Sequence, residues 1–116
     1  MGRGKGMRID GWKIHTLELS GDTVPIGYKV VTEELMSTGL SNTPQVQYLE
    51  GEWVHYNEYG IWSGRVPSTA RWLGKYIREA HSRDTRVFIT ALDEVIGASK
   101  MGVKSNGIML LEEVIE

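Results

Sequence analysis

The chain has 116 residues, of which 41% are apolar and 24% are charged, as in one ordinary globular domain. It contains no cysteine, which excludes disulfides, cysteine-ligated zinc and thiol chemistry. No apolar run approaches the roughly 20 residues of a membrane-spanning helix, so we expect no membrane partner. The glycine-rich, basic start MGRGKGMRID lacks the apolar core of a secretion signal. We therefore expect a cytoplasmic protein with a flexible basic tail over residues 1–10 and a single domain over residues 11–116.

The net charge of −2 conceals an uneven distribution of charge along the chain. Five acids and no Lys or Arg lie between Glu33 and Glu58, whereas residues 65–86 hold six bases and two acids. This pattern predicts an electropositive surface, which would concentrate anionic ligands. The alternative is that these bases lie on a solvated helix face and pair with the acidic block.

The first two strands are predicted from apolar alternation. Residues 12–19, WKIHTLEL, fit a strand with a phase slip near His15, and Ser20-Gly21-Asp22 is a turn signal. Residues 26–32, IGYKVVT, are rich in β-branched side chains and predict a second strand. Thr32 is then expected to cap a short helical turn that ends at Gly39.

Short strands are predicted in the middle of the chain, at residues 46–49, 53–56 and 61–63. Pro67 then begins the main helix, which should end near residues 81–83. Its buried face repeats at helical spacing and comprises Ala70, Leu73, Ile77 and Ala80. Gly74 costs roughly 1 kcal/mol inside a helix, which predicts close packing at that position.

The C-terminal third is predicted to be β structure. Residues 86–92, RVFITAL, fit a strand covered on both faces and extended by residues 95–98. Asn106-Gly107 favours a tight hairpin turn that would join residues 100–105 to residues 108–115. The last strand is apolar on both faces near its start and is a candidate dimer interface. The predicted fold is α+β, a mixed or mostly antiparallel sheet packed on one main helix over about residues 67–82.

No strong catalytic or metal-binding signature is present. The three histidines are scattered, so a structural or surface role is expected for each, with no metal and no bound cofactor. Asp93 and Glu94 are adjacent on a strand and point to opposite faces, so they do not form a matched acid–base pair.

The better case is recognition of an anion. The turn over residues 65–71 combines positive charge, free helix amides and aromatic faces for stacking. The predicted ligand-binding residues are the aromatic Trp62, Trp72 and Tyr76, the basic Arg65 and Arg71, and the hydroxyl-bearing Ser63, Ser68 and Thr69. The alternative is that these tryptophans belong to the core.

The runs GYKVVTEEL and STGL, followed by GIWSGRVPSTARWLGKY and RVFITAL, resemble the skeleton of the ADP-ribosyltransferase-like fold. The resemblance implies a nicotinamide-side residue at Tyr28 or Lys29, a small hydroxyl residue at Ser63 and a catalytic glutamate at Glu94. The chain also resembles small uncharacterised proteins of phages and prokaryotes through its YKV, GEW, KSN and LLE motifs.

These observations predict binding rather than catalysis. We expect a protein that binds a small anionic nucleotide-type ligand, with Lys29 added to the site by the resemblance. Sequestration of a signalling nucleotide in a host cytoplasm would suit a phage accessory protein. One alternative is an ADP-ribosyltransferase-like enzyme that uses NAD and Glu94. Another is a module that binds protein or nucleic acid, with nucleic acid not favoured.

Overall fold

A computed structural model describes residues 7–38, 45–56, 58 and 60–115 of the chain. In this part of the chain, eight strands accompany one helix. The strands are β1 (Met7–Ile9), β2 (Trp12–Ile14), β3 (Thr16–Leu19), β4 (Asp22–Thr32), β5 (Trp53–His55), β6 (Ile61–Gly64), β7 (Thr85–Ala98) and β8 (Gly102–Glu113), and the helix is α1 (Pro67–His81). These elements form a small single domain of one helix and a mostly antiparallel sheet, which agrees with the α+β class.

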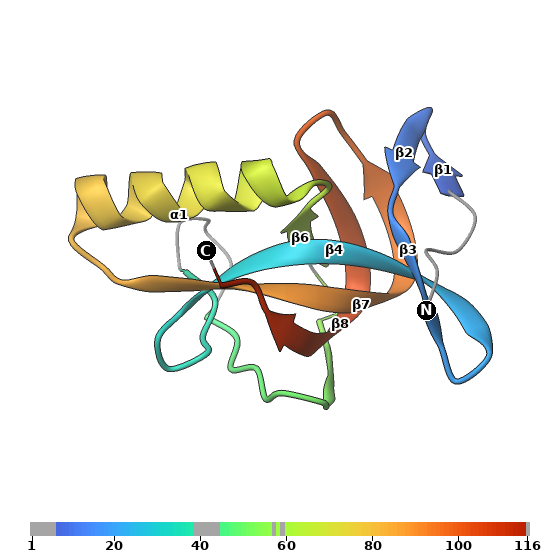
Figure 1. The fold of residues 1–116 in the computed structure, drawn as a ribbon, viewed down its shortest axis with the longest axis horizontal. Helices are drawn as coiled ribbons and strands as arrows, with labels where there is room; N and C mark the ends of the chain where they lie inside the picture. The colour runs from blue at the N-terminus through green and yellow to red at the C-terminus, as the bar shows by residue number, and fades with distance from the viewer. Residues whose placement is uncertain (1–6, 39–44, 57, 59, 116) are drawn as a thin grey trace.

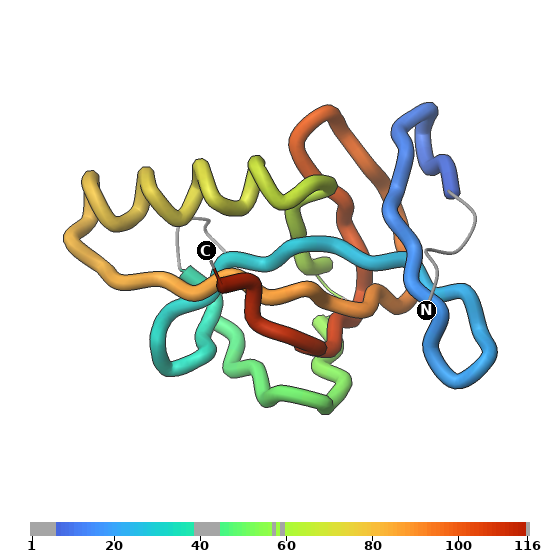
Figure 2. The backbone as a smooth tube through the Cα atoms, in the orientation of Figure 1, coloured from blue at the N-terminus to red at the C-terminus, as the bar shows by residue number. Residues whose placement is uncertain are grey.

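The pairings among the four central strands close into a ring (Figures 1 and 2). β4 pairs with β7, β7 with β8, and β8 with β6, and β6 returns to β4 through Tyr28 and Gly64. β3 extends the sheet from the first half of β4, and β5 extends it from β8. All of these strand pairs are antiparallel. Residues far apart in the sequence are thereby brought together around β4.

Alternate side chains of one strand point to opposite sides of the sheet. A hydrophobic core lies on each side. Val31 and Phe88 belong to a core on the side away from α1, whereas Val30 packs with Ala70 and Ile77 of the helix. The prediction that the strand over residues 86–92 is covered on both faces is confirmed. This strand, β7, also extends to Ala98, as expected.

The predicted helix is confirmed from Pro67 to His81, and Ser82 follows it in the left-handed conformation. Gly74 is buried, as the expected close packing requires, and Thr85 donates a hydrogen bond to its carbonyl at 3.5 Å. The prediction for Ala80 is wrong, because its side chain is exposed where the last turn of α1 extends past the end of β4 (Figure 1). α1 has 15 residues and is too short and too polar to span a membrane, and the structure describes no other helix.

The predicted hairpin turn at Asn106-Gly107 is wrong. The turn between β7 and β8 falls at residues 99–101, and Asn106 and Gly107 lie in the middle of β8. Gly107 serves close packing there, since a Cβ atom at this position would lie 2.5 Å from the His55 ring. Asn106 donates a hydrogen bond to Glu94 across the strand pair.

The N-terminal segment also differs from the prediction in part. Met7–Ile9 forms strand β1 and pairs with β2, so these residues do not belong to a flexible tail. Asp10 lies in the turn after β1 and accepts a hydrogen bond from the Ala98 amide at 3.1 Å. Residues 1–6 of the predicted tail lie outside the described residues. The predicted phase slip at His15 is confirmed as the break between β2 and β3, and Ser20-Gly21 forms the tight turn into β4.

The residues after β4 form a tight turn and not the predicted short helix. Leu35 donates its amide to the Thr32 carbonyl and has a φ of 64°, which does not continue a right-handed helix. The predicted strand over residues 46–49 makes a single isolated bridge, between Met36 and Gln47. The predicted helix stop at Gly39 falls outside the described residues.

A candidate ligand pocket beside Lys29

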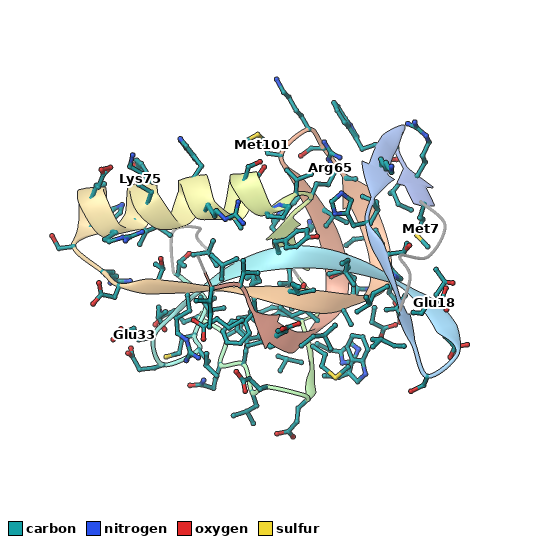
Figure 3. The ribbon with its side chains drawn as sticks, viewed as in Figure 1. Met7, Glu18, Glu33, Arg65, Lys75 and Met101 are labelled. Atoms are coloured by element: carbon teal, nitrogen blue, oxygen red, sulfur yellow. The ribbon has the colours of Figure 1, made fainter. Side chains whose placement is uncertain are left out.

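A pocket of about 480 Å³ opens where the N-terminal half of α1 meets β4 and β6. The β7–β8 turn closes one side, and Figure 3 shows Met101 of that turn above the start of the helix. The lining comes from five parts of the chain and comprises Tyr28, Lys29, Val30, Thr38, Trp62, Ser63, Gly64, Thr69, Ala70, Trp72, Leu73, Ser99, Met101 and Gly102. Its volume lies within the range of small-molecule sites in proteins.

Lys29 provides the positive charge of this pocket. Its side chain is half-buried, and its Nζ donates a hydrogen bond to the Trp62 carbonyl at 2.7 Å. Burial lowers the pKa of Lys29 from 10.5 to about 8, so the amine is still largely charged at neutral pH. Among the described residues no carboxylate forms an ion pair with it. The ammonium group therefore retains two N–H donors for another partner.

Ser63 adds a buried hydroxyl to the same pocket. The residue is 4% exposed, and its Oγ has no hydrogen-bond partner among the described residues. A buried hydroxyl in this state costs about 1–3 kcal/mol relative to a satisfied one. A ligand oxygen would remove that cost only if the lining moved to uncover the Oγ, which is shielded from solvent. Thr90 holds the other such hydroxyl of the described chain, but it does not line the pocket.

Aromatic rings form the mouth of the pocket. Trp62 is 50% exposed and Trp72 is 59% exposed, an unusual state for two tryptophans in so small a domain. Trp72 is stacked on Tyr76, with ring centroids 5.8 Å apart and planes 12° from parallel. Tyr76 thus holds the orientation of Trp72 from outside the pocket. The alternative prediction that Trp62 and Trp72 serve the core does not agree with this exposure.

Arg65 does not contribute to the pocket, although the sequence suggested it as an anion ligand. Its guanidinium donates hydrogen bonds to the carbonyls of Lys13 at 2.8 Å, Ser99 at 3.1 Å and Lys100 at 3.1 Å. It also lies over the Trp12 ring, 5.1 Å from the centroid. Arg65 therefore holds the β7–β8 turn against β2.

The other predicted residues divide between the pocket and the outer surface of α1. Thr69 lines the pocket, whereas Ser68 is exposed outside it. Arg71 lies in a shallow depression on the helix with Lys75 and Arg78. Of the predicted turn over residues 65–71, Thr69 and Ala70 line the pocket, whereas Arg65 and Arg71 do not. Figure 3 shows Lys75 on the α1 side of the molecule, away from Glu33. Other bases of the same block lie beside the acidic block, because Arg86 donates a hydrogen bond to the Glu33 carbonyl at 3.4 Å and Arg83 lines a depression with Glu33 and Glu34.

The three positions implied by the ADP-ribosyltransferase-like resemblance are only partly brought together. Tyr28, Lys29 and Ser63 line the pocket, but Glu94 does not. Glu94 is exposed, has a φ of 51° and accepts a hydrogen bond from Asn106 at 2.9 Å. The structure thus separates the candidate catalytic carboxylate from the candidate ligand site.

The histidines have structural partners. His15 Nδ1 hydrogen-bonds to the Tyr28 hydroxyl at 2.9 Å, and His55 Nε2 pairs with Asp93 at 2.8 Å. His81 meets the Tyr76 ring edge-on. No group of three or more His, Asp or Glu side chains suitable for a metal ion occurs in the part of the chain that the structure describes.

Sequence reasoning missed the contribution of the β7–β8 turn, because Asn106-Gly107 was the stronger turn signal. Ser99, Met101 and Gly102 would have been found by reading S-K-M-G as the turn instead.

Comparisons of the chain with protein-family models, with curated proteins and with solved structures return no match.

Proposed function

We propose that this protein binds a small anionic nucleotide-type ligand in the pocket beside Lys29. The observation that carries the proposal is one ammonium group without a carboxylate partner among the described residues. It belongs to a pocket that is also lined by two exposed tryptophans and by Ser63, whose hydroxyl has no hydrogen-bond partner in the described chain. A cation and a hydroxyl donor suit an oxyanion. Exposed tryptophan faces suit a flat ring such as a nucleobase.

The proposal is for binding without catalysis. Glu94, the residue that the sequence suggested for catalysis, lies outside the pocket. A binding protein of this kind lowers the free concentration of its ligand, which is how it would sequester a signalling nucleotide. The outer surface of α1, with its basic residues, supports the alternative of a macromolecular partner less well, because it has no comparable pocket with buried polar groups.

Isothermal titration calorimetry with a panel of mononucleotides at pH 7 and 0.15 M salt tests the proposal. The expected result is binding of at least one nucleotide by the wild-type protein. Lys29→Met should weaken that binding about tenfold or more, through loss of a charge-assisted hydrogen bond. Trp62→Ala should weaken it by a similar factor, through loss of stacking.

Lys75→Met is the matched control, because Lys75 lies on the outer surface of α1 and not in the pocket lining. It removes the same charge from the same protein and should leave the affinity within about twofold, since a charge at the surface is well screened at this salt concentration. Absence of heat with every nucleotide, or equal losses in Lys29→Met and Lys75→Met, would contradict the proposed site.

A further inference from the structure

Among the described residues, the pocket lining contains a single cationic side chain. Of the residues that line it, only Lys29 carries a positive charge. Lys104 approaches from outside, where its Nζ lies 5.8 Å from the centroid of the Trp62 ring, and it is not part of the lining.

Arg65 cannot readily supply a second charge. Every nitrogen of its guanidinium already donates to a backbone carbonyl, and the group is held over the Trp12 ring. Turning it toward the pocket would leave the carbonyls of Lys13, Ser99 and Lys100 without these bonds, at a cost of about 1 kcal/mol or more for each.

The remaining lining is poorly suited to further negative charge. Val30, Leu73 and Met101 have no polar side-chain donor, and Trp62 and Trp72 have only a neutral indole N–H. A second anionic oxygen group placed among them would lose its water without gaining a cation, which is unfavourable. The polar groups of the lining other than Lys29 are neutral hydroxyls and backbone groups.

We propose that the ligand is a monoanion, with one oxyanionic group at Lys29 and Ser63 joined to a flat ring that occupies the tryptophan-lined mouth. This inference rests on the proposed function and restricts it. A phosphodiester, as in a cyclic mononucleotide, has the required charge, and so does an aryl carboxylate. Phosphate monoesters and polyphosphates carry charges that this pocket does not neutralise.

Titration calorimetry with ligands that share one ring and differ in charge tests this restriction. The series is adenosine, which is neutral, cyclic AMP, AMP and ATP, without magnesium, and indole-3-acetate represents the aryl carboxylates. If the monoanion is a phosphodiester, cyclic AMP should bind at least about tenfold more tightly than AMP, and AMP more tightly than ATP. If it is a carboxylate, indole-3-acetate should bind and the nucleotides should not.

The outcomes separate the two proposals. Tighter binding of AMP or ATP than of cyclic AMP overturns the monoanion inference and leaves the nucleotide proposal standing. Binding of indole-3-acetate alone supports the monoanion inference and overturns the nucleotide part of the proposed function. Absence of binding by all of these ligands overturns both.

A designed second cation provides an independent test. Thr69 lines the pocket in the first turn of α1, and its neighbour Ser68 is exposed outside the pocket. Thr69→Lys should shift the preference between cyclic AMP and AMP at least about tenfold toward AMP, because the dianion gains a partner. Ser68→Lys introduces the same charge at the same end of the helix and should leave that ratio within twofold. An unchanged ratio in Thr69→Lys, with the variant folded by circular dichroism, overturns the inference.

Discussion

The two halves of α1 meet the sheet in different ways. The C-terminal half is closely packed as far as Ile77, which is 1% exposed, and a Cβ atom at Gly74 would lie 3.0 Å from the Thr85 hydroxyl of β7. Beyond Ile77 the last turn is exposed. The N-terminal half stands beside a pocket of about 480 Å³, with Leu73 only half-buried. One helix therefore closes the core at one end and leaves a concave surface at the other.

The charged side chains at the two ends also differ, in whether they have a partner of opposite charge. At the closed end, Arg86 forms a bidentate pair with Glu113 at 3.1 and 2.8 Å, and its guanidinium lies over the Phe88 ring. At the open end, Lys29 donates to a single carbonyl and has no carboxylate partner among the described residues. The closed end thus satisfies its own polar groups, whereas the open end retains capacity that a ligand can use.

Truncation of a buried side chain should have the largest effect, and only in the closed half. We expect Ile77→Ala to lower the free energy of unfolding by about 3 kcal/mol, through lost burial and a cavity. Leu73→Ala removes a half-buried side chain beside the pocket and should cost about 1 kcal/mol, because little new cavity is created. Urea unfolding followed by tryptophan fluorescence measures both values. Equal losses would show that the two halves are equally well packed.

Replacement of Lys29 should stabilise the protein at neutral pH. Its pKa is about 8 when folded and 10.5 in its ordinary state, so below pH 8 both states are protonated and the cost of burying the charge is fully present. Between these values only the unfolded state holds the proton, so stability rises with pH. We expect Lys29→Met to be more stable by about 2 kcal/mol at pH 7, since each pKa unit is worth about 1.4 kcal/mol and burial is partial.

Urea unfolding of both proteins from pH 7 to pH 10 tests this expectation. The difference in stability between Lys29→Met and the wild type should shrink as the pH rises. Tyr48 acts in the opposite direction above pH 10, because burial raises its pKa and the unfolded state then loses its proton first. Comparing the two proteins at each pH cancels that contribution. A difference independent of pH would show that Lys29 is not desolvated.

Local patterns predicted α1 and its packing against the sheet well. Pro67 fixes the start of a helix, the 3.6-residue spacing of Ala70 and Ile77 defines its buried face, and Gly74 indicates close packing. These features depend on residues near each other in the chain. The same holds for the β-branched run that became β7.

The open half could not be predicted in the same way, because its residues meet only through long-range pairings. Lys29 and Ser63 lie together because β6 returns to β4 at Tyr28 and Gly64, a contact that no local pattern indicates. Arg65 looked like an anion ligand because a sequence does not reveal which guanidinium groups are occupied by backbone carbonyls. Asn106-Gly107 had the composition of a turn, but the long pairing of β7 with β8 overrode that local preference.

Two buried hydroxyls, one in the pocket and one outside it, can be compared through their effects on stability and on ligand binding. Ser63 and Thr90 both lack a hydrogen-bond partner among the described residues, and only Ser63 lines the pocket. Ser63→Ala and Thr90→Val should each raise stability by about 1 kcal/mol, because each removes an unsatisfied polar atom. Only Ser63→Ala should also weaken ligand binding, by about fivefold. Equal effects on binding would show that the Ser63 hydroxyl does not contact the ligand.

The smallest expected effect lies in the ion pair of the closed end. Arg86 holds the pKa of Glu113 below its ordinary value, chiefly through the hydrogen bonds between them. This pair therefore stabilises the fold above the ordinary pKa of a glutamate, and the contribution is lost as the pH falls through the lowered value. Glu113→Gln should be slightly less stable than the wild type at pH 7, and the gap should close in acid. Glu112→Gln, at an exposed neighbouring position, is the control and should show no such convergence. Because the pair is partly exposed, both the effect and its pH dependence should weaken in 1 M salt, whereas the preference of the Lys29 pocket for a monoanion should persist there.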